Sequence, residues 1–164
     1  MTTVVETTPQ WARRLAHAVP LMVLPSGLWR IAFVLGLPVV GMPVGGLLEH
    51  TYVVTLVLVS EGAALLTLGL VQPWGEVVPR WIPLIGGRRV HPMAAFVPAM
   101  TGAAVLVVLW AWVSWGVATT EFYDHFDADV QRVLVTACYL PLLAWGPALA
   151  AVAIAYLRRR RAHG

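Results

Sequence analysis

Four long apolar stretches divide the sequence, and short polar segments separate them. They run approximately over residues 21–45, 51–71, 93–117 and 133–157. The hydrocarbon core of a bilayer is roughly 30 Å thick and needs about 20 apolar residues of helix, so each stretch is long enough to cross it once. Strands with alternating apolar and polar residues are absent from the pattern. We therefore predict an all-α integral membrane four-helix bundle, with residues 1–164 forming a single transmembrane domain.

The first apolar stretch is the least regular of the four. Pro25, Pro38 and Pro43 interrupt it, and Arg30 lies within it. Proline removes a backbone hydrogen bond and clashes with the preceding turn, so we expect the regular helix to be shorter than the stretch. The segment WARRLAHAV, residues 11–19, places basic residues ahead of the apolar run. It predicts a short N-terminal amphipathic segment that lies at the level of the lipid headgroups.

Composition supports a membrane environment. Hydrophobic residues make up 59% of the chain and charged residues 12%, whereas soluble domains have about 45–50% apolar and about 25% charged residues. The net charge of +3 could indicate nucleic-acid binding, but the arginines do not gather on a polar, soluble face. An anionic membrane surface is the more natural partner, and we predict no nucleic-acid partner. The single cysteine, Cys138, excludes an intramolecular disulfide bond.

The arginines predict the orientation of the chain. All of them except Arg30 and Arg132 fall on one side of the predicted topology: Arg13, Arg14, Arg80, Arg88, Arg89 and Arg158 to Arg161. The connector TTEFYDHFDAD on the other side carries acidic residues and no arginine. By the positive-inside rule, the arginine-bearing side is cytoplasmic. We therefore expect a multi-pass protein of a bacterial plasma membrane with both termini in the cytoplasm.

The connector between the second and third stretches, residues 70–92, combines prolines, tryptophans and arginines. Its prolines stop the flanking helices. Tryptophan suits the membrane interface, and an arginine near anionic headgroups contributes about 1 kcal/mol. We expect a stiff cytoplasmic cap pressed against the membrane. Its predicted interfacial anchors are Trp74, Arg80, Trp81, Arg88 and Arg89.

Arg30 and Glu61 are the two charges expected inside the spans. In a hairpin that turns at Gly45 and Gly46, they would lie equally far along the chain from the turn. A charge at a helix centre costs roughly 2.5 to 3.5 kcal/mol, so each side chain should have a partner, and a salt bridge between them is the simplest. This candidate intramembrane ion pair could be a fixed packing element. It could also be a gate, proton relay or ligand anchor, or Arg30 could extend to the surface beside a protonated Glu61.

Two further features bear on possible sites. The acidic connector could bind a divalent cation, but its spacing matches no calcium loop and a solvated acidic loop needs no ligand, so no metal site is predicted.

Pro141 and Pro147 are expected to kink the fourth stretch. A kink of this kind can open a ligand cavity, although it more often serves packing alone.

The usual motifs of nucleotide, acyl-transfer, zinc and redox chemistry are absent, so we predict no catalytic residue and no cofactor. The first functional hypothesis is a non-enzymatic membrane component, either an accessory subunit of another membrane protein or a self-associating bundle. The alternative is a small oligomeric transporter or channel that uses the pair Arg30 and Glu61. A second alternative is an interfacial enzyme that acts on lipid.

Three phrases carry a resemblance: PSGLWR at 25–30, LVQPWGEVVPRWIPLIGGRRV at 70–90, and AWGPALAAVAIAYLRRR at 144–160. In these the chain resembles small multi-span integral membrane proteins of actinobacteria, a functionally uncharacterised group. The chain contains no lysine and no asparagine, as expected from a GC-rich genome. The resemblance implies an actinobacterial membrane protein and assigns no catalytic or binding residue.

Overall fold

The computed structural model describes residues 8–39, 45–72, 75, 87, 90–120, 122–126 and 128–162. Its helices are α1 (Gln10–Val34), α2 (Leu47–Gly69), α3 (Pro92–Thr119), α4 (Asp129–Tyr139) and α5 (Trp145–Ala162). Two short 3₁₀ segments are also present, η2 (Phe122–His125) and η3 (Leu140–Ala144), and η3 joins α4 to α5 directly. The described residues contain no strand. The prediction of an all-helical fold is confirmed.

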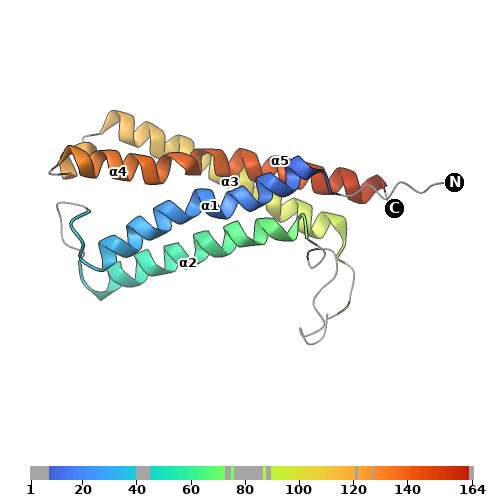
Figure 1. Cartoon of the computed structure of the whole chain (residues 1–164), viewed down its shortest axis with the longest axis horizontal. Helices are drawn as coiled ribbons and strands as arrows, with labels where there is room; N and C mark the ends of the chain where they lie inside the picture. Colours follow the sequence, from blue (N-terminus) through green and yellow to red (C-terminus); the bar gives the residue numbers. More distant parts are fainter. Residues whose placement is uncertain are drawn as a thin grey trace.

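The helices form an elongated bundle (Figure 1). Helix α1 lies between α2 on one side and the α4–α5 element on the other, and α3 crosses obliquely behind them. The start of α1, the end of α2, the start of α3 and the end of α5 lie at one end of the bundle, which we call the terminal end. The opposite end carries the end of α1, the start of α2, the end of α3 and the start of α4.

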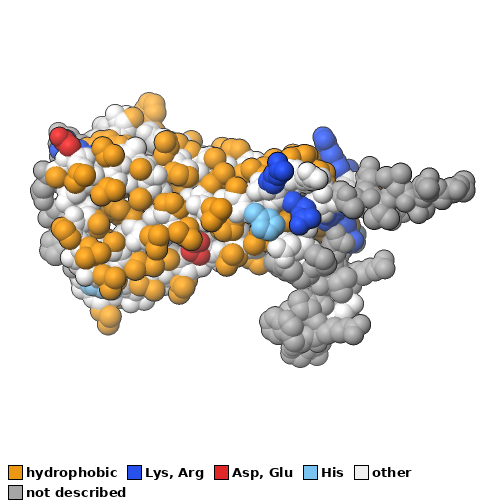
Figure 2. All heavy atoms as spheres, viewed as in Figure 1, with side chains coloured by type: hydrophobic (Ala, Val, Ile, Leu, Met, Phe, Trp, Pro, Cys, Tyr) orange, Lys and Arg blue, Asp and Glu red, His pale blue; other side chains and the backbone are white. Residues whose placement is uncertain are grey.

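Four helical segments are long and apolar enough to cross a membrane: α1, α2, α3 and the continuous element Asp129–Ala162. Large hydrophobic side chains are exposed along their whole length, among them Leu21, Leu58, Val108 and Trp112. Figure 2 shows these side chains covering the visible face of the bundle, while arginines gather at the terminal end. An apolar surface this large is far beyond that of soluble monomers, which rarely expose more than a few hundred Å² in one patch.

The core lies mainly where α1, α2 and α5 meet. Small side chains let these helices approach closely, as is typical of membrane helices. Ala16, Ala64 and Ala153 are fully buried in these contacts. The large buried residues Trp145 and Tyr156 fill the remaining space on α5. Helix α3 packs along α5 but is otherwise little covered.

The first helix begins earlier than the sequence pattern suggested. Residues 11–19, expected as a separate amphipathic segment, form the first turns of α1, and this expectation was wrong. Pro20 and Pro25 lie inside α1, because neighbouring helices and hydroxyl side chains compensate for lost backbone hydrogen bonds in membrane helices. The helix ends before Gly36, whose φ of 74° interrupts the helical path. Regular helix therefore occupies 10–34. The prediction that it is shorter than the stretch 21–45 at the C-terminal side is confirmed.

Candidate functional site: an aromatic pocket beside Arg30

Arg30 and Glu61 lie on adjacent helices without forming the expected salt bridge. Arg30 lies about one turn before the end of α1, and Glu61 lies past the middle of α2. Among the described residues, Asp129–Arg132 is the only ion pair within 4.0 Å. Helix α1 stops at Val34, so the long hairpin turning at Gly45 and Gly46, on which the expectation rested, does not form. The charge of Arg30 still acts on Glu61 through space.

Glu61 instead packs against the backbone of α1 at Gly27. A Cβ atom added to Gly27 would lie 2.8 Å from Oε1 of Glu61, so the carboxylate would have to shift to admit a larger residue here. Gly27 and the neighbouring Ser26 are fully enclosed between the helices, and the Ser26 hydroxyl donates to the Val23 carbonyl at 2.8 Å. The half-buried carboxylate therefore forms part of the α1–α2 contact.

The partner of Arg30 is an aromatic ring. Its guanidinium lies over the ring of Tyr139 on α4, 5.2 Å from the centroid, which is within the range of a cation–π interaction. Tyr139 also meets Trp29 edge-on at 5.5 Å and Trp110 at 6.1 Å between ring centroids. None of these three aromatic residues was predicted from the sequence as part of a site. They come from α1, α3 and α4, and no spacing along the chain connects them.

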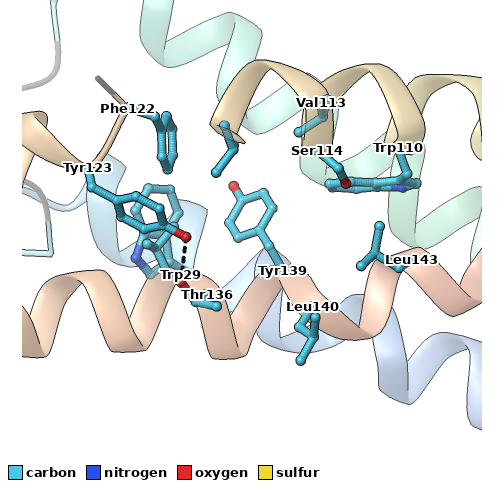
Figure 3. Close-up of a pocket in the computed structure, with 12 residues that line it drawn as sticks. Trp29, Trp110, Val113, Ser114, Phe122, Tyr123, Thr136, Tyr139, Leu140 and Leu143 are labelled. Carbon is cyan, nitrogen blue, oxygen red and sulfur yellow. Dashed lines mark hydrogen bonds between the residues drawn. The ribbon is translucent and has the colours of Figure 1, made fainter. Parts of the chain in front are cut away.

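A cavity of about 450 Å³ lies beside this aromatic group, toward the opposite end of the bundle. We call it the aromatic pocket. In Figure 3, Tyr139 reaches from α4 into the space between Phe122 and α3. The walls are largely apolar, and a pocket of this size and character can hold a small membrane-soluble molecule. Its lining residues are Trp29, Trp110, Val113, Ser114, Val117, Phe122, Tyr123, Val135, Thr136, Tyr139, Leu140 and Leu143.

Segment η2 closes one side of the pocket and is tied to α4 by a hydrogen bond. The Thr136 hydroxyl donates to the Arg132 carbonyl at 2.8 Å. Its oxygen is therefore the acceptor for the Tyr123 hydroxyl, 3.1 Å away. This contact, drawn in Figure 3, holds the Tyr123 ring at the edge of the pocket.

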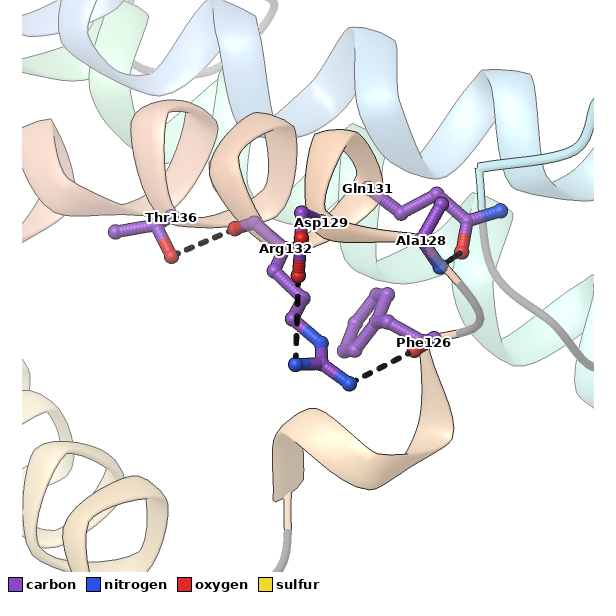
Figure 4. Close-up of polar contacts among 6 residues, drawn as sticks. All are labelled: Phe126, Ala128, Asp129, Gln131, Arg132 and Thr136. Atoms are coloured by element: carbon purple, nitrogen blue, oxygen red, sulfur yellow. Dashed lines mark hydrogen bonds and ion pairs between the residues drawn. The ribbon is translucent and has the colours of Figure 1, made fainter.

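The start of α4 is anchored by a second set of polar contacts (Figure 4). Arg132 forms an ion pair with Asp129 at 3.6 Å and donates to the Phe126 carbonyl at 3.3 Å. On another side of the helix, Gln131 donates to the Pro38 carbonyl at 3.0 Å. These bonds connect α4 to the residues after α3 and after α1, so they fix the elements that surround the pocket.

Two polar groups of the pocket lining have no partner. The indole nitrogens of Trp29 and Trp110 are buried and make no hydrogen bond. A buried donor without an acceptor loses its hydrogen bonds to water, at a cost of about 1–3 kcal/mol. A nitrogen of the Arg30 guanidinium is buried without an acceptor as well. The side chains around the pocket thus include buried donors that have no acceptor among the residues the structure describes.

The remaining residues singled out from the sequence give no site. The predicted interfacial anchors Trp74, Arg80, Trp81, Arg88 and Arg89 lie outside the described residues, as do Glu121 and Asp127 of the acidic connector. The side chains of Asp124 and His125 are not described either. Within the part of the chain that the structure describes, no group of three or more His, Cys, Asp or Glu residues could hold a metal ion.

No protein-family model, no curated protein and no solved structure matches the chain. The resemblance to actinobacterial membrane proteins stays a prediction.

Proposed function

We propose that this chain is a non-enzymatic integral membrane protein whose aromatic pocket binds a largely apolar molecule that carries acceptor oxygens. The observation that carries this proposal is a largely apolar lining that includes the hydroxyl side chains of Ser114, Tyr123, Thr136 and Tyr139. The unpartnered indole N–H groups of Trp29 and Trp110 are buried directly behind the pocket surface. A guest made only of hydrocarbon would leave both indole donors unsatisfied. A carbonyl or ether oxygen on an apolar ring or chain would accept from an indole N–H group once the tryptophan ring turns toward the pocket, while the walls bury the rest of the molecule.

The same arrangement favours binding over catalysis. The pocket lining contains no carboxylate, histidine, cysteine or lysine, which are the groups that most often act as general acid, general base or nucleophile. Tyr139 is the side chain closest to a charged group, and Arg30 lies over its ring. We propose that Arg30 orients Tyr139 and makes the pocket electropositive.

A transporter built on Arg30 and Glu61 receives less support. The Glu61 carboxylate packs against Gly27 in the α1–α2 contact, and no pocket is lined by both Arg30 and Glu61 among the residues that the structure describes. A polar pathway would need these two helices to separate. We therefore propose that Glu61 serves helix packing. We also propose that the protein binds its ligand while it is associated with itself or with a partner subunit.

The proposed orientation places both termini in the cytoplasm. Arg13, Arg14, Arg158 and Arg161 are exposed at the terminal end, and positive charge favours the cytoplasmic side. The aromatic pocket would then lie toward the outer leaflet. Reporter fusions after Ala162 and within the connector 120–128 test this orientation, and a cytoplasmic signal from the second fusion would contradict it.

Binding is tested with two matched probes, 2,3-dimethyl-1,4-naphthoquinone and 2,3-dimethylnaphthalene. Both have the same fused rings and methyl groups, and only the first carries carbonyl oxygens. Calorimetric titration of the protein in a neutral maltoside detergent gives the two dissociation constants. One hydrogen bond contributes about 0.5–1.5 kcal/mol, so the quinone should bind about two- to tenfold more tightly for each donor it engages.

Substitution of the donors provides the control. Trp29→Phe and Trp110→Phe keep an aromatic ring but remove the N–H group, so each should reduce the preference for the quinone. Trp112→Phe should leave it unchanged, because Trp112 is 73% exposed on α3 and does not line the pocket. Equal binding of the two probes by the parent protein, or an unaltered preference in both pocket variants, would refute the proposal.

A further inference from the structure

A second hollow lies at the terminal end, between the start of α1 and the end of α5. Its volume is about 520 Å³. It is separate from the aromatic pocket and shares no lining residue with it. The residues that line it are Pro9, Trp11, Ala151, Ile154, Ala155, Arg158 and Arg159. We call it the arginine hollow.

The lining of the arginine hollow changes from apolar to positively charged along one face of α5. Ala151, Ala155 and Arg158 are spaced by three or four residues and therefore line up on the same side of the helix. At a rise of 1.5 Å per residue, this stripe extends about 10 Å along the helix axis. The hollow is thus apolar on the side toward the middle of the bundle and cationic at its mouth, where the headgroups of a surrounding bilayer would lie.

Neighbouring elements hold Arg159 in place. It donates hydrogen bonds to the Thr8 hydroxyl and to the carbonyl of Leu70 at the end of α2, and its guanidinium lies 5.8 Å from the ring centroid of Tyr156. These contacts connect α5 to the residue before α1 and to the end of α2. The cationic mouth is therefore built on a fixed framework.

Arg158, in contrast, is exposed and makes no ion pair with any residue that the structure describes. Its side chain is available to a ligand from outside the protein. Trp11 is 53% exposed on the other side of the hollow. Tryptophan is the residue most typical of the membrane interface, where its N–H group meets the polar part of lipids.

We propose that the arginine hollow binds one anionic phospholipid. The phosphate would lie against Arg158, because its planar guanidinium can donate paired hydrogen bonds to phosphate oxygens, and the charge of Arg159 lies beside it. Trp11 would pack at the level of the glycerol backbone, and an acyl chain would follow the apolar stripe past Ala155 to Ala151. A free phosphate ion uses only the mouth of the hollow, whereas a phospholipid also fills its apolar part.

The test uses the full chain in a neutral maltoside detergent and three probes: phosphatidylglycerol, phosphatidylcholine with the same acyl chains, and inorganic phosphate. Native mass spectrometry or calorimetric titration gives the affinities. We expect phosphatidylglycerol to bind more tightly than either other probe. Arg158→Gln should weaken its binding about fivefold, the equivalent of about 1 kcal/mol for one arginine near an anionic headgroup.

Arg161→Gln is the matched control. Arg161 lies on the same helix and is exposed, but it does not line the hollow, so phosphatidylglycerol binding should be unchanged. A second variant, Ala151→Leu, fills part of the apolar stripe and should weaken phosphatidylglycerol binding without affecting phosphate.

Three results would overturn the proposal. An equal loss in Arg158→Gln and Arg161→Gln would mean diffuse electrostatic attraction to the terminal end instead of a site. Equal affinity for phosphatidylcholine would show that the arginines do not recognise the headgroup charge. Phosphate binding as tight as that of phosphatidylglycerol, together with no effect of Ala151→Leu, would identify a free anion as the ligand.

Discussion

Gly146 controls how closely α3 and α5 approach, and its replacement by alanine tests the packing of the bundle. A Cβ atom at this position would lie 2.8 Å from Cγ2 of Val107, 3.0 Å from the carbonyl oxygen of Ala103 and 3.1 Å from the backbone nitrogen of Val107. The valine methyl can turn away, but the two backbone atoms cannot. The helices must therefore separate to admit one methyl group.

The expected size of the effect follows from two opposing contributions. Forcing an extra methyl group into a packed contact costs about 1–3 kcal/mol. Alanine is a better helix former than glycine by about 1 kcal/mol at most. We expect Gly146→Ala to lower the free energy of unfolding by about 1–2 kcal/mol, measured by titration with sodium dodecyl sulfate in maltoside micelles.

Gly102 provides a control in the same helix pair. A Cβ atom on Gly102 would have its nearest neighbour, Cδ2 of Leu149, at 3.8 Å, which is an ordinary contact. Gly102→Ala should therefore be neutral or slightly stabilising. If Gly146→Ala is as stable as the parent while Gly102→Ala is destabilised, the reasoning from the close approach of α3 and α5 is refuted.

Two further predictions concern the polar groups at and near the opposite end. A double-mutant cycle of Arg30→Met and Glu61→Gln should give a coupling energy below about 1 kcal/mol, because the two side chains make no ion pair within 4.0 Å. Breaking a buried salt bridge costs about 3–5 kcal/mol. A coupling energy of that size would contradict the structure. Tyr123→Phe removes the hydrogen bond to Thr136, so it should lower the free energy of unfolding by about 0.5–1.5 kcal/mol and speed hydrogen exchange in residues 122–126. The control is Tyr52→Phe, which should change neither quantity because Tyr52 is exposed on α2.

The number and order of the helices could be predicted from the apolar stretches alone. Lipid offers no hydrogen bonds to the backbone, so an apolar run long enough to cross the bilayer has to be helical whatever its neighbours are. The second and third stretches contain few interruptions, and α2 and α3 begin and end within a few residues of them. Local composition was sufficient there because the polar segments at both ends of these stretches mark where the apolar runs stop.

The first helix could not be placed by the same argument. Arg13, Arg14 and His17 make residues 11–19 look like a separate surface segment, yet a helix can continue from the headgroup region into the lipid without a break. The expected shortening of regular helix within 21–45 is confirmed, because α1 ends at Val34, ahead of Pro38. Pro20 and Pro25 lie within α1, where the contacts with α2 and α5 stabilise the helix around them. Helix α1 also does not extend to Gly45, so the two helices do not turn where the prediction placed the turn. The geometrical argument for a salt bridge between Arg30 and Glu61 depended on that turn.

The aromatic pocket was beyond prediction for a different reason. Trp29, Trp110 and Tyr139 lie far apart in the sequence, on three helices, and each looks like an ordinary interfacial or core aromatic residue. Only the crossing of α3 behind α1 and α4 brings them together. The unpaired indole donors are a property of that assembly, and no pattern within a single helix encodes it.

Pro141 is the one local feature that connects the sequence to the pocket. It has no N–H group for the carbonyl of Ala137, and the chain leaves α-helical geometry at this point to form η3. After η3, α5 packs along α3; before it, α4 makes few contacts with α3. The pocket occupies the resulting gap, and residues of α4 and η3 form one of its walls. The pocket therefore lies at the level where the fourth span leaves α-helical geometry and where the obliquely crossing α3 lies apart from α4.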